Sequence, residues 1–147
     1  MIALDTNILV YAHRHGSTYH TEAYRLVATL AESREPYALF WPSLYEFLRV
    51  VTNHRVFDPP SSPGKAFEAL AQFLAPPGVH VLSEGIHHHE ILERVLRETP
   101  VSGNLMHDAH LVALALEHGV HQILTADADF SRFPQIFSRN PFIGHQI

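Results

Sequence analysis

The chain contains no cysteine, and this absence excludes two kinds of structure at once. A disulfide scaffold cannot form, and neither can a metal site built from thiolates. The sequence also has no apolar run long enough to span a membrane, and Met1 leads into Ile2-Ala3-Leu4-Asp5 without a basic and apolar leader. We therefore expect a cytoplasmic protein that has no membrane partner.

Positive charge is scarce as well, because 10 Lys and Arg residues stand against 15 Asp and Glu residues and give a net charge of −5. This balance argues against a general nucleic-acid coat protein, which is normally basic. It does not exclude an enzyme that meets phosphate through a metal ion. Nine of the ten basic residues are Arg, which favours directed phosphate contacts. The 13 histidines are scattered apart from His87-His88-His89, a run that favours a solvated helix start over a metal tract.

Length and hydrophobic content predict one domain over residues 1–147, because 46% hydrophobic residues can build a real core. Short apolar runs alternate with helical periods, which predicts an α/β fold with a mostly parallel sheet. The expected strands are 2–4, 37–41, 79–82 and 122–125, with a further short strand near 136–137. The expected helices are 7–13, 17–33, 65–74, 86–98 and 105–118, together with one after Pro42 for which Ser43 is a candidate N-cap.

Acidic residues stand where these elements meet. Asp5 follows the first strand directly, and Asp127 lies two residues past the fourth, at the sheet edge where parallel α/β folds bind ligands. Glu46 is expected in the first turn of the helix after the second strand. Asp108 shares the apolar stripe of helix 105–118, where an acid is unexpected unless it has a partner. The sequence therefore predicts that four acids converge on one edge.

Such a cluster is stable only if the acids are protonated, paired with Arg or Lys, or neutralised by cations. Oxygen ligands suit Mg²⁺ or Mn²⁺, and an ion held there can activate water and stabilise the leaving oxygen of a phosphodiester. Taken singly, each acid also has an ordinary interpretation as a turn former, a helix cap or a first-turn residue. The joint arrangement favours metal-dependent phosphodiester hydrolysis.

Four short blocks in a fixed order carry a more specific signal. They are Leu4-Asp5-Thr6-Asn7-Ile8-Leu9, Pro42-Ser43-Leu44-Tyr45-Glu46-Phe47, Asn104-Leu105-Met106-His107-Asp108-Ala109-His110-Leu111 and Leu124-Thr125-Ala126-Asp127-Ala128-Asp129-Phe130. With these blocks the chain resembles PIN-domain proteins and, more narrowly, the VapC toxins of bacterial toxin–antitoxin pairs.

The resemblance implies a three-layer α/β/α sandwich, Rossmann-like, around a parallel sheet of about five strands. It also implies Mg²⁺- or Mn²⁺-dependent endoribonuclease activity, often on structured RNA such as tRNA. The family's acids correspond to Asp5, Glu46, Asp108 and Asp127, and Asp129 is a candidate further metal ligand, so whether Asp127 or Asp129 is the fourth ligand stays open. Polar supporting positions of the family correspond to Thr6, Asn7 and Thr125.

Partners follow from the same resemblance. VapC toxins are usually homodimers, and a small VapB-type antitoxin inserts a segment whose Arg often pairs with the acids. Arg49, one turn after Glu46, is a candidate for a phosphate contact, and an ion pair with that acid is equally compatible with its position. Arg14 and Arg55 are weaker candidates for RNA contacts.

Two alternatives are left. Haloacid-dehalogenase-type phosphatases also place an Asp after the first strand, but they need a second Asp two residues later, where this chain has Asn7. A catalytically silent PIN domain that binds RNA or a protein is the other alternative. The presence of all four acids argues against it.

Overall fold

The computed structural model describes residues 1–143 and contains a five-stranded sheet. The strands lie in the order β3-β2-β1-β4-β5, and every neighbouring pair is parallel. Their bounds are β1 (Ile2–Leu4), β2 (Tyr37–Phe40), β3 (Val79–Leu82), β4 (Gln122–Leu124) and β5 (Phe137–Arg139). The predicted α/β class and parallel sheet are therefore confirmed, and the fifth strand begins one residue later than expected.

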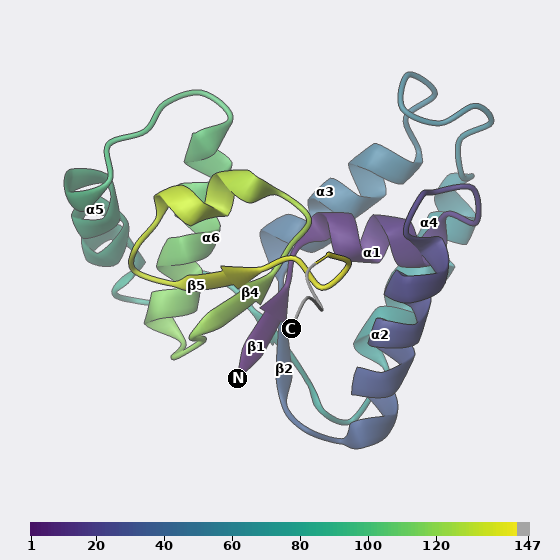
Figure 1. Cartoon of the computed structure of the whole chain (residues 1–147), viewed down its shortest axis with the longest axis horizontal. Helices are drawn as coiled ribbons and strands as arrows, with labels where there is room; N and C mark the ends of the chain where they lie inside the picture. The colour runs from purple at the N-terminus through teal and green to yellow at the C-terminus, as the bar shows by residue number, and fades with distance from the viewer. Residues whose placement is uncertain (144–147) are drawn as a thin grey trace.

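Helices cover both faces of this sheet (Figure 1). Because side chains alternate along a strand, Leu4, Leu39 and Leu124 point into one apolar cluster while Ala3, Ala38 and Ile123 point into another. Residues of α1 to α4 fill the first cluster, and residues of α5, α6 and η1 fill the second. The helices are α1 (Thr6–His13), α2 (His20–Ser33), α3 (Trp41–Val51), α4 (Pro63–Leu74), α5 (His88–Glu98), α6 (Leu105–Glu117) and the 3-10 helix η1 (Ala128–Arg132). The three-layer sandwich is confirmed.

The order of the strands fixes where a ligand can bind. From β1 the chain adds β2 and β3 on one side and β4 and β5 on the other, so the direction of winding reverses between β1 and β4. Leu4 pairs with Leu124 across this boundary, and the N–H of Asp5 donates to the carbonyl of Leu124 at 3.0 Å. In open α/β sheets the crevice at such a switch point is the usual ligand site. The segments that follow β1 and β4 border this crevice.

The prediction for the start of α3 is wrong in one respect. Ser43 is not its N-cap, because α3 begins at Trp41 with Phe40 as the cap residue, and Pro42 occupies the first turn. Proline is tolerated there because its missing N–H would have no helical partner in the first turn. Trp41 therefore belongs to the helix and not to the strand, and Glu46 lies in the second turn.

Helix α6 has seven buried residues, and among them Leu111, Val112 and Leu114 are fully inaccessible. It ends at Glu117, one residue earlier than predicted, and is closed as predicted by Gly119, whose φ of +71° is the left-handed conformation that glycine adopts without steric cost. Within residues 1–143, no helix combines the length and the apolar character that crossing a membrane requires.

Candidate active site

Asp5 lies directly after β1 and is almost fully buried, with 6% of its surface exposed. It caps α1, because its Oδ1 accepts the N–H of Thr6 at 2.7 Å. Its Oδ2 accepts the hydroxyl of Thr125 at 2.7 Å and the side-chain amide of Asn7 at 3.1 Å. Burial raises the pKa of Asp5, while the Thr125 and Thr6 hydrogen bonds lower it in part. Donors from both sides of the β1–β4 switch point thus fix this carboxylate.

Asn7 and Thr125 also hold the second segment of the site in place. The side-chain oxygen of Asn7 accepts the N–H of Ala126 at 3.0 Å, and Thr125 Oγ1 accepts the N–H of Asp127 at 3.0 Å. The amide of Asn7 lies 3.2 Å from Thr125 Oγ1. The two polar side chains therefore connect the loop after β4 to Asp5, and their supporting role is structural.

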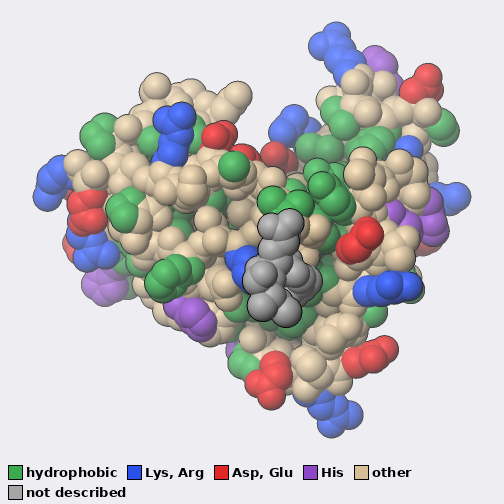
Figure 2. Space-filling view, viewed as in Figure 1, with side chains coloured by type: hydrophobic (Ala, Val, Ile, Leu, Met, Phe, Trp, Pro, Cys, Tyr) green, Lys and Arg blue, Asp and Glu red, His purple; other side chains and the backbone are tan. Residues whose placement is uncertain are grey.

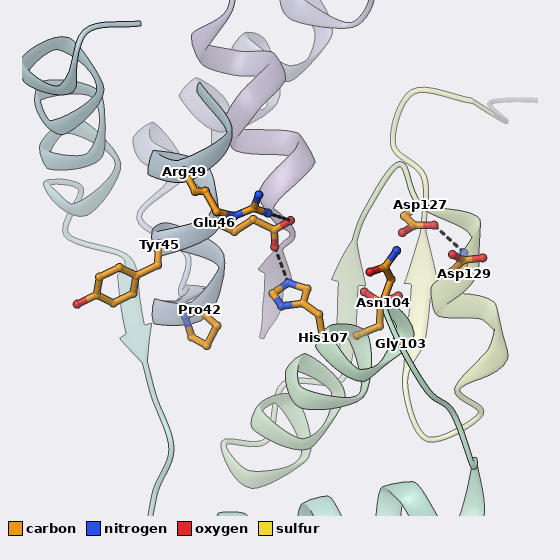
Figure 3. Close-up of a pocket in the computed structure, with 10 residues that line it drawn as sticks. Pro42, Tyr45, Glu46, Arg49, Gly103, Asn104, His107, Asp127 and Asp129 are labelled. Atoms are coloured by element: carbon orange, nitrogen blue, oxygen red, sulfur yellow. Dashed lines mark hydrogen bonds and ion pairs between the residues drawn. The ribbon is translucent and has the colours of Figure 1, made fainter. Parts of the chain in front are cut away.

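Glu46 projects from α3 toward His107 on α6 (Figure 3). The His107 Nε2 to Glu46 Oε2 distance is 2.7 Å, and Arg49 Nη2 lies 3.7 Å from Glu46 Oε1. Thr6 Oγ1 donates to Glu46 Oε2 at 3.5 Å. The imidazole of His107 holds the pKa of Glu46 below its ordinary value, and Glu46 in turn raises the pKa of His107. This ion pair spans the gap between α3 and α6.

Asp108 lies one residue further along α6 and is only 7% exposed. Burial, together with the nearby negative charges of Asp127 and Asp5, raises the pKa of Asp108 to about 7. Within residues 1–143, no Lys or Arg lies within ion-pair distance of this carboxylate. Asp108 is therefore a buried acid whose charge no Lys or Arg of the described residues neutralises.

Asp127 and Asp129 stand at the start of η1 and are exposed. Asp127 Oδ1 accepts the N–H of Asp129 at 2.9 Å, so Asp127 caps this short helix. One carboxylate oxygen from each of Asp108, Asp127 and Asp129 lies within 4.8 Å of the other two. An all-oxygen set at this spacing could hold a hard divalent cation.

These acids line a cleft of about 670 Å³. Figure 2 shows the hollow at the top of the molecule, with acidic side chains at its floor. Glu46, Arg49 and Tyr45 line it from α3, and Asn104, His107 and Asp108 from the start of α6. Asp127 and Asp129 close the remaining side, and Asp5 borders an adjoining hollow that shares Glu46, His107 and Asp108. The predicted acids are thus brought to one edge of the sheet.

The sequence matches the PIN domain family over residues 2–136. The chain belongs to the PIN domain family. Within this family it is similar to ribonuclease VapC43 of Mycobacterium tuberculosis, with 39% identity over 98% of this chain and 97% of the relative. Ribonuclease VapC48 of the same species is 36% identical over 95% of this chain and 97% of the relative. The resemblance to VapC ribonucleases is therefore confirmed.

Solved structures of PIN domains agree on the fold. VapBC2 from Rickettsia felis, bound to a DNA fragment from its promoter, matches with a TM-score of 0.70 at 20% identity over 95% of this chain and 98% of the other. VapC20 of Mycobacterium tuberculosis, a Sarcin-Ricin loop cleaving toxin, matches with a TM-score of 0.67 at 18% identity over 92% and 97%. At these identities the likeness concerns the fold of this PIN domain.

The three arginines predicted as candidates for RNA contacts lie in different places in this PIN domain. Arg49 lines the cleft, whereas Arg14 donates to the carbonyl of Pro59 at 2.9 Å and lies over the ring of Phe57. Arg14 therefore braces the loop after α3, and Arg55 is exposed on that loop outside the cleft lining.

Sequence reasoning missed His107, although it lies in the block that carries Asp108. A histidine adjacent to a predicted acid was the available signal, but its partner Glu46 comes from another helix.

Proposed function

We propose that this VapC-family PIN domain is a divalent-metal-dependent endoribonuclease, with Mg²⁺ or Mn²⁺ held by carboxylates and RNA phosphodiesters as substrate. The observation that carries the proposal is Asp108, which is buried beside Asp127 and Asp5 and has no Lys or Arg partner among the described residues. A divalent cation would neutralise this cluster, and three carboxylate oxygens within 4.8 Å of one another suit such an ion.

The residues that would hold the ion are Asp108, Asp127 and Asp129, with Asp5 and Glu46 completing the shell directly or through water. When bound, the ion would polarise the phosphodiester and lower the pKa of a bound water. Asp5 is oriented by its three hydrogen-bond donors, which also oppose the rise of its pKa on burial, and this support is typical of carboxylates around metal centres.

Glu46 is held in place by His107 and Arg49. Because Arg49 is exposed at the wall of the cleft, its guanidinium can turn from Glu46 to an RNA phosphate, to which it can donate two parallel hydrogen bonds. We propose this contact as the main role of Arg49 in substrate binding. The positions of Arg14 and Arg55 on or against the loop after α3 support at most a peripheral role in RNA binding.

We further propose that the protein is the toxin of a toxin–antitoxin pair and that a VapB-type antitoxin inhibits it. Related folds were solved as VapBC complexes from Rickettsia felis and Salmonella typhimurium, which supports this partner. An antitoxin arginine would supply further positive charge to the acidic cleft. The family resemblance also supports a single domain over residues 1–147 that forms a homodimer. It supports cytosolic RNA, such as tRNA, as the substrate.

Cleavage of total RNA with and without Mg²⁺ or Mn²⁺ tests the proposal. We expect metal-dependent cleavage by the wild-type protein and its loss in Asp5→Ala and Asp108→Ala. Glu68→Ala, which removes an exposed acid on α4, is the matched control and should cleave as the wild type does. If both site variants still cleave, the carboxylates do not form the active site. If the wild type binds RNA but never cleaves it, the protein is a silent binding module.

A further inference from the structure

A second group of side chains that could hold a metal ion lies where the loop after β3 and the start of α5 meet α6. Glu84 comes from the loop after β3, His88 is the first residue of α5, and His110 lies on α6. One possible ligand atom from each lies within 4.8 Å of the other two. None of these three residues belongs to the acidic cleft, so the group needs an explanation of its own.

The geometry within the group is that of a partly assembled site. His110 Nε2 lies 2.6 Å from Glu84 Oε1, and the rings of His88 and His110 have centroids 5.2 Å apart. A tetrahedral zinc ion with bonds of about 2.0–2.1 Å separates its ligand atoms by roughly 3.3 Å. The 2.6 Å between His110 and Glu84 is shorter than this, so binding an ion would require Glu84, which is 43% exposed on a loop, to move away from His110.

A fourth residue, Glu117, lies against one of the histidines. His88 Nδ1 faces Glu117 Oε2 at 3.5 Å, and Glu117 is more than nine-tenths buried, with 8% of its side chain exposed. Neither of these two atoms has a hydrogen-bond partner among the described residues. Gly85 leaves room for this carboxylate, because a Cβ there would come within 2.4 Å of Glu117 Oε1.

The orientation of His88 decides what the group can do. Because Nδ1 faces Glu117, Nε2 is the nitrogen left to bind a ligand. A carboxylate on the far nitrogen of a ligating histidine is a common feature of zinc sites, where it fixes the ring and raises its basicity. Two imidazoles and one carboxylate form a ligand set that suits zinc and other transition metals, whereas the all-oxygen cleft suits Mg²⁺ or Mn²⁺.

We propose that Glu84, His88 and His110 form a second metal site, which takes a zinc-type transition-metal ion and is oriented by Glu117. The fourth coordination position faces the surface hollow that Leu92, Met106 and His107 line together with these ligands. The bound ion joins the loop after β3, the start of α5 and α6. Since α6 also carries His107 and Asp108, the ion stabilises the helix from which the acidic cleft is built.

Calorimetric titration of the metal-free protein with Zn²⁺, in excess Mg²⁺ to fill the acidic cleft, tests this site. We expect one Zn²⁺ per chain and a Zn²⁺-dependent rise in melting temperature. Glu117→Gln should weaken Zn²⁺ binding about 10- to 100-fold, as changes behind a metal ligand do, and His88→Gln, His110→Gln and Glu84→Gln at least as much. Because Glu84 lies on an exposed loop, Glu84→Gln is the variant least able to disturb folding.

Two controls separate this site from its surroundings. His89→Gln removes the neighbouring exposed histidine, and Asp108→Asn alters the acidic cleft; both should bind Zn²⁺ as the wild type does. The proposal is overturned if the wild type binds no Zn²⁺, if the ligand variants bind it unchanged, or if Asp108→Asn abolishes binding. The experiment measures Zn²⁺ binding, so its outcome does not depend on whether the protein cleaves RNA.

Discussion

Replacing Asp108 by Asn should make the metal-free protein more stable while it abolishes cleavage. The pKa of Asp108 rises from 3.8 to about 7 in the folded chain. Each pKa unit corresponds to about 1.4 kcal/mol, so ionised Asp108 costs the fold up to about 4 kcal/mol. Water at the cleft screens part of this cost, and the new amide loses some hydration. We therefore expect a net gain of about 1–3 kcal/mol at pH 8.

The pH dependence gives the sign of the effect. The folded chain holds the Asp108 proton more tightly than the unfolded chain, so the free energy of unfolding falls as the pH rises between 3.8 and about 7. Above that range this contribution is lost and the curve levels off. In the Asp108→Asn variant, the free energy of unfolding should fall less over this pH range. Mg²⁺ should restore stability to the wild type at pH 8 and have little effect on the variant.

Urea unfolding at pH 5 and pH 8, in a chelator and in Mg²⁺, measures the effects of pH and of metal on the free energy of unfolding. In a thermal scan, a gain of 1 kcal/mol should raise the melting temperature by about 4 °C. Glu68→Gln serves as the control for loss of one negative charge on the surface. The reasoning is refuted if metal-free Asp108→Asn is no more stable than Glu68→Gln at pH 8. In that case Asp108 carries its charge without cost, and the main support for a cation in the cleft is lost.

Two further substitutions test the groups that hold the acids. His107→Gln should lower the free energy of unfolding at pH 6 by about 0.5–1 kcal/mol, because the variant loses the ion pair through which Glu46 raises the pKa of His107. In the wild type this stabilisation is lost as the pH rises above 6.5 through that raised pKa. Urea unfolding from pH 5.5 to 8.5 should show a flatter curve for the variant, and an unchanged slope would contradict the ion pair. Thr125→Val should cost about 1–3 kcal/mol, because a buried oxygen of Asp5 loses its 2.7 Å donor, and should weaken Mg²⁺ binding about 10- to 100-fold. Thr125→Ser keeps the hydroxyl and should match the wild type in unfolding and in metal titration; equal losses in both variants would exclude the hydrogen bond as the cause.

Local patterns predicted most of the elements of this fold because each pattern lies within one segment. Short apolar runs between the helical segments indicated the strands, and the stripe on α6 marked both its burial and the unusual position of Asp108. The start of α3 was predicted wrongly because Ser43 in the Pro42-Ser43 pair is a typical cap in isolation. The chain instead enters the helix directly from β2, which moves Glu46 one turn further from the start.

The sequence by itself determined which acids reach the sheet edge, because Asp5 is covalently attached to the end of β1 and Asp127 stands two residues past the expected end of the fourth strand. Their roles as metal ligands stay predictions. Only the tertiary structure decided the partners: Thr125 for Asp5, His107 for Glu46, and Asp127 with Asp129 for Asp108. These pairs join residues from different elements, and the strand order β3-β2-β1-β4-β5 brings them together. The Glu84–His88–His110 group arises in the same way, since a pattern within one segment carries no information about what packs against it.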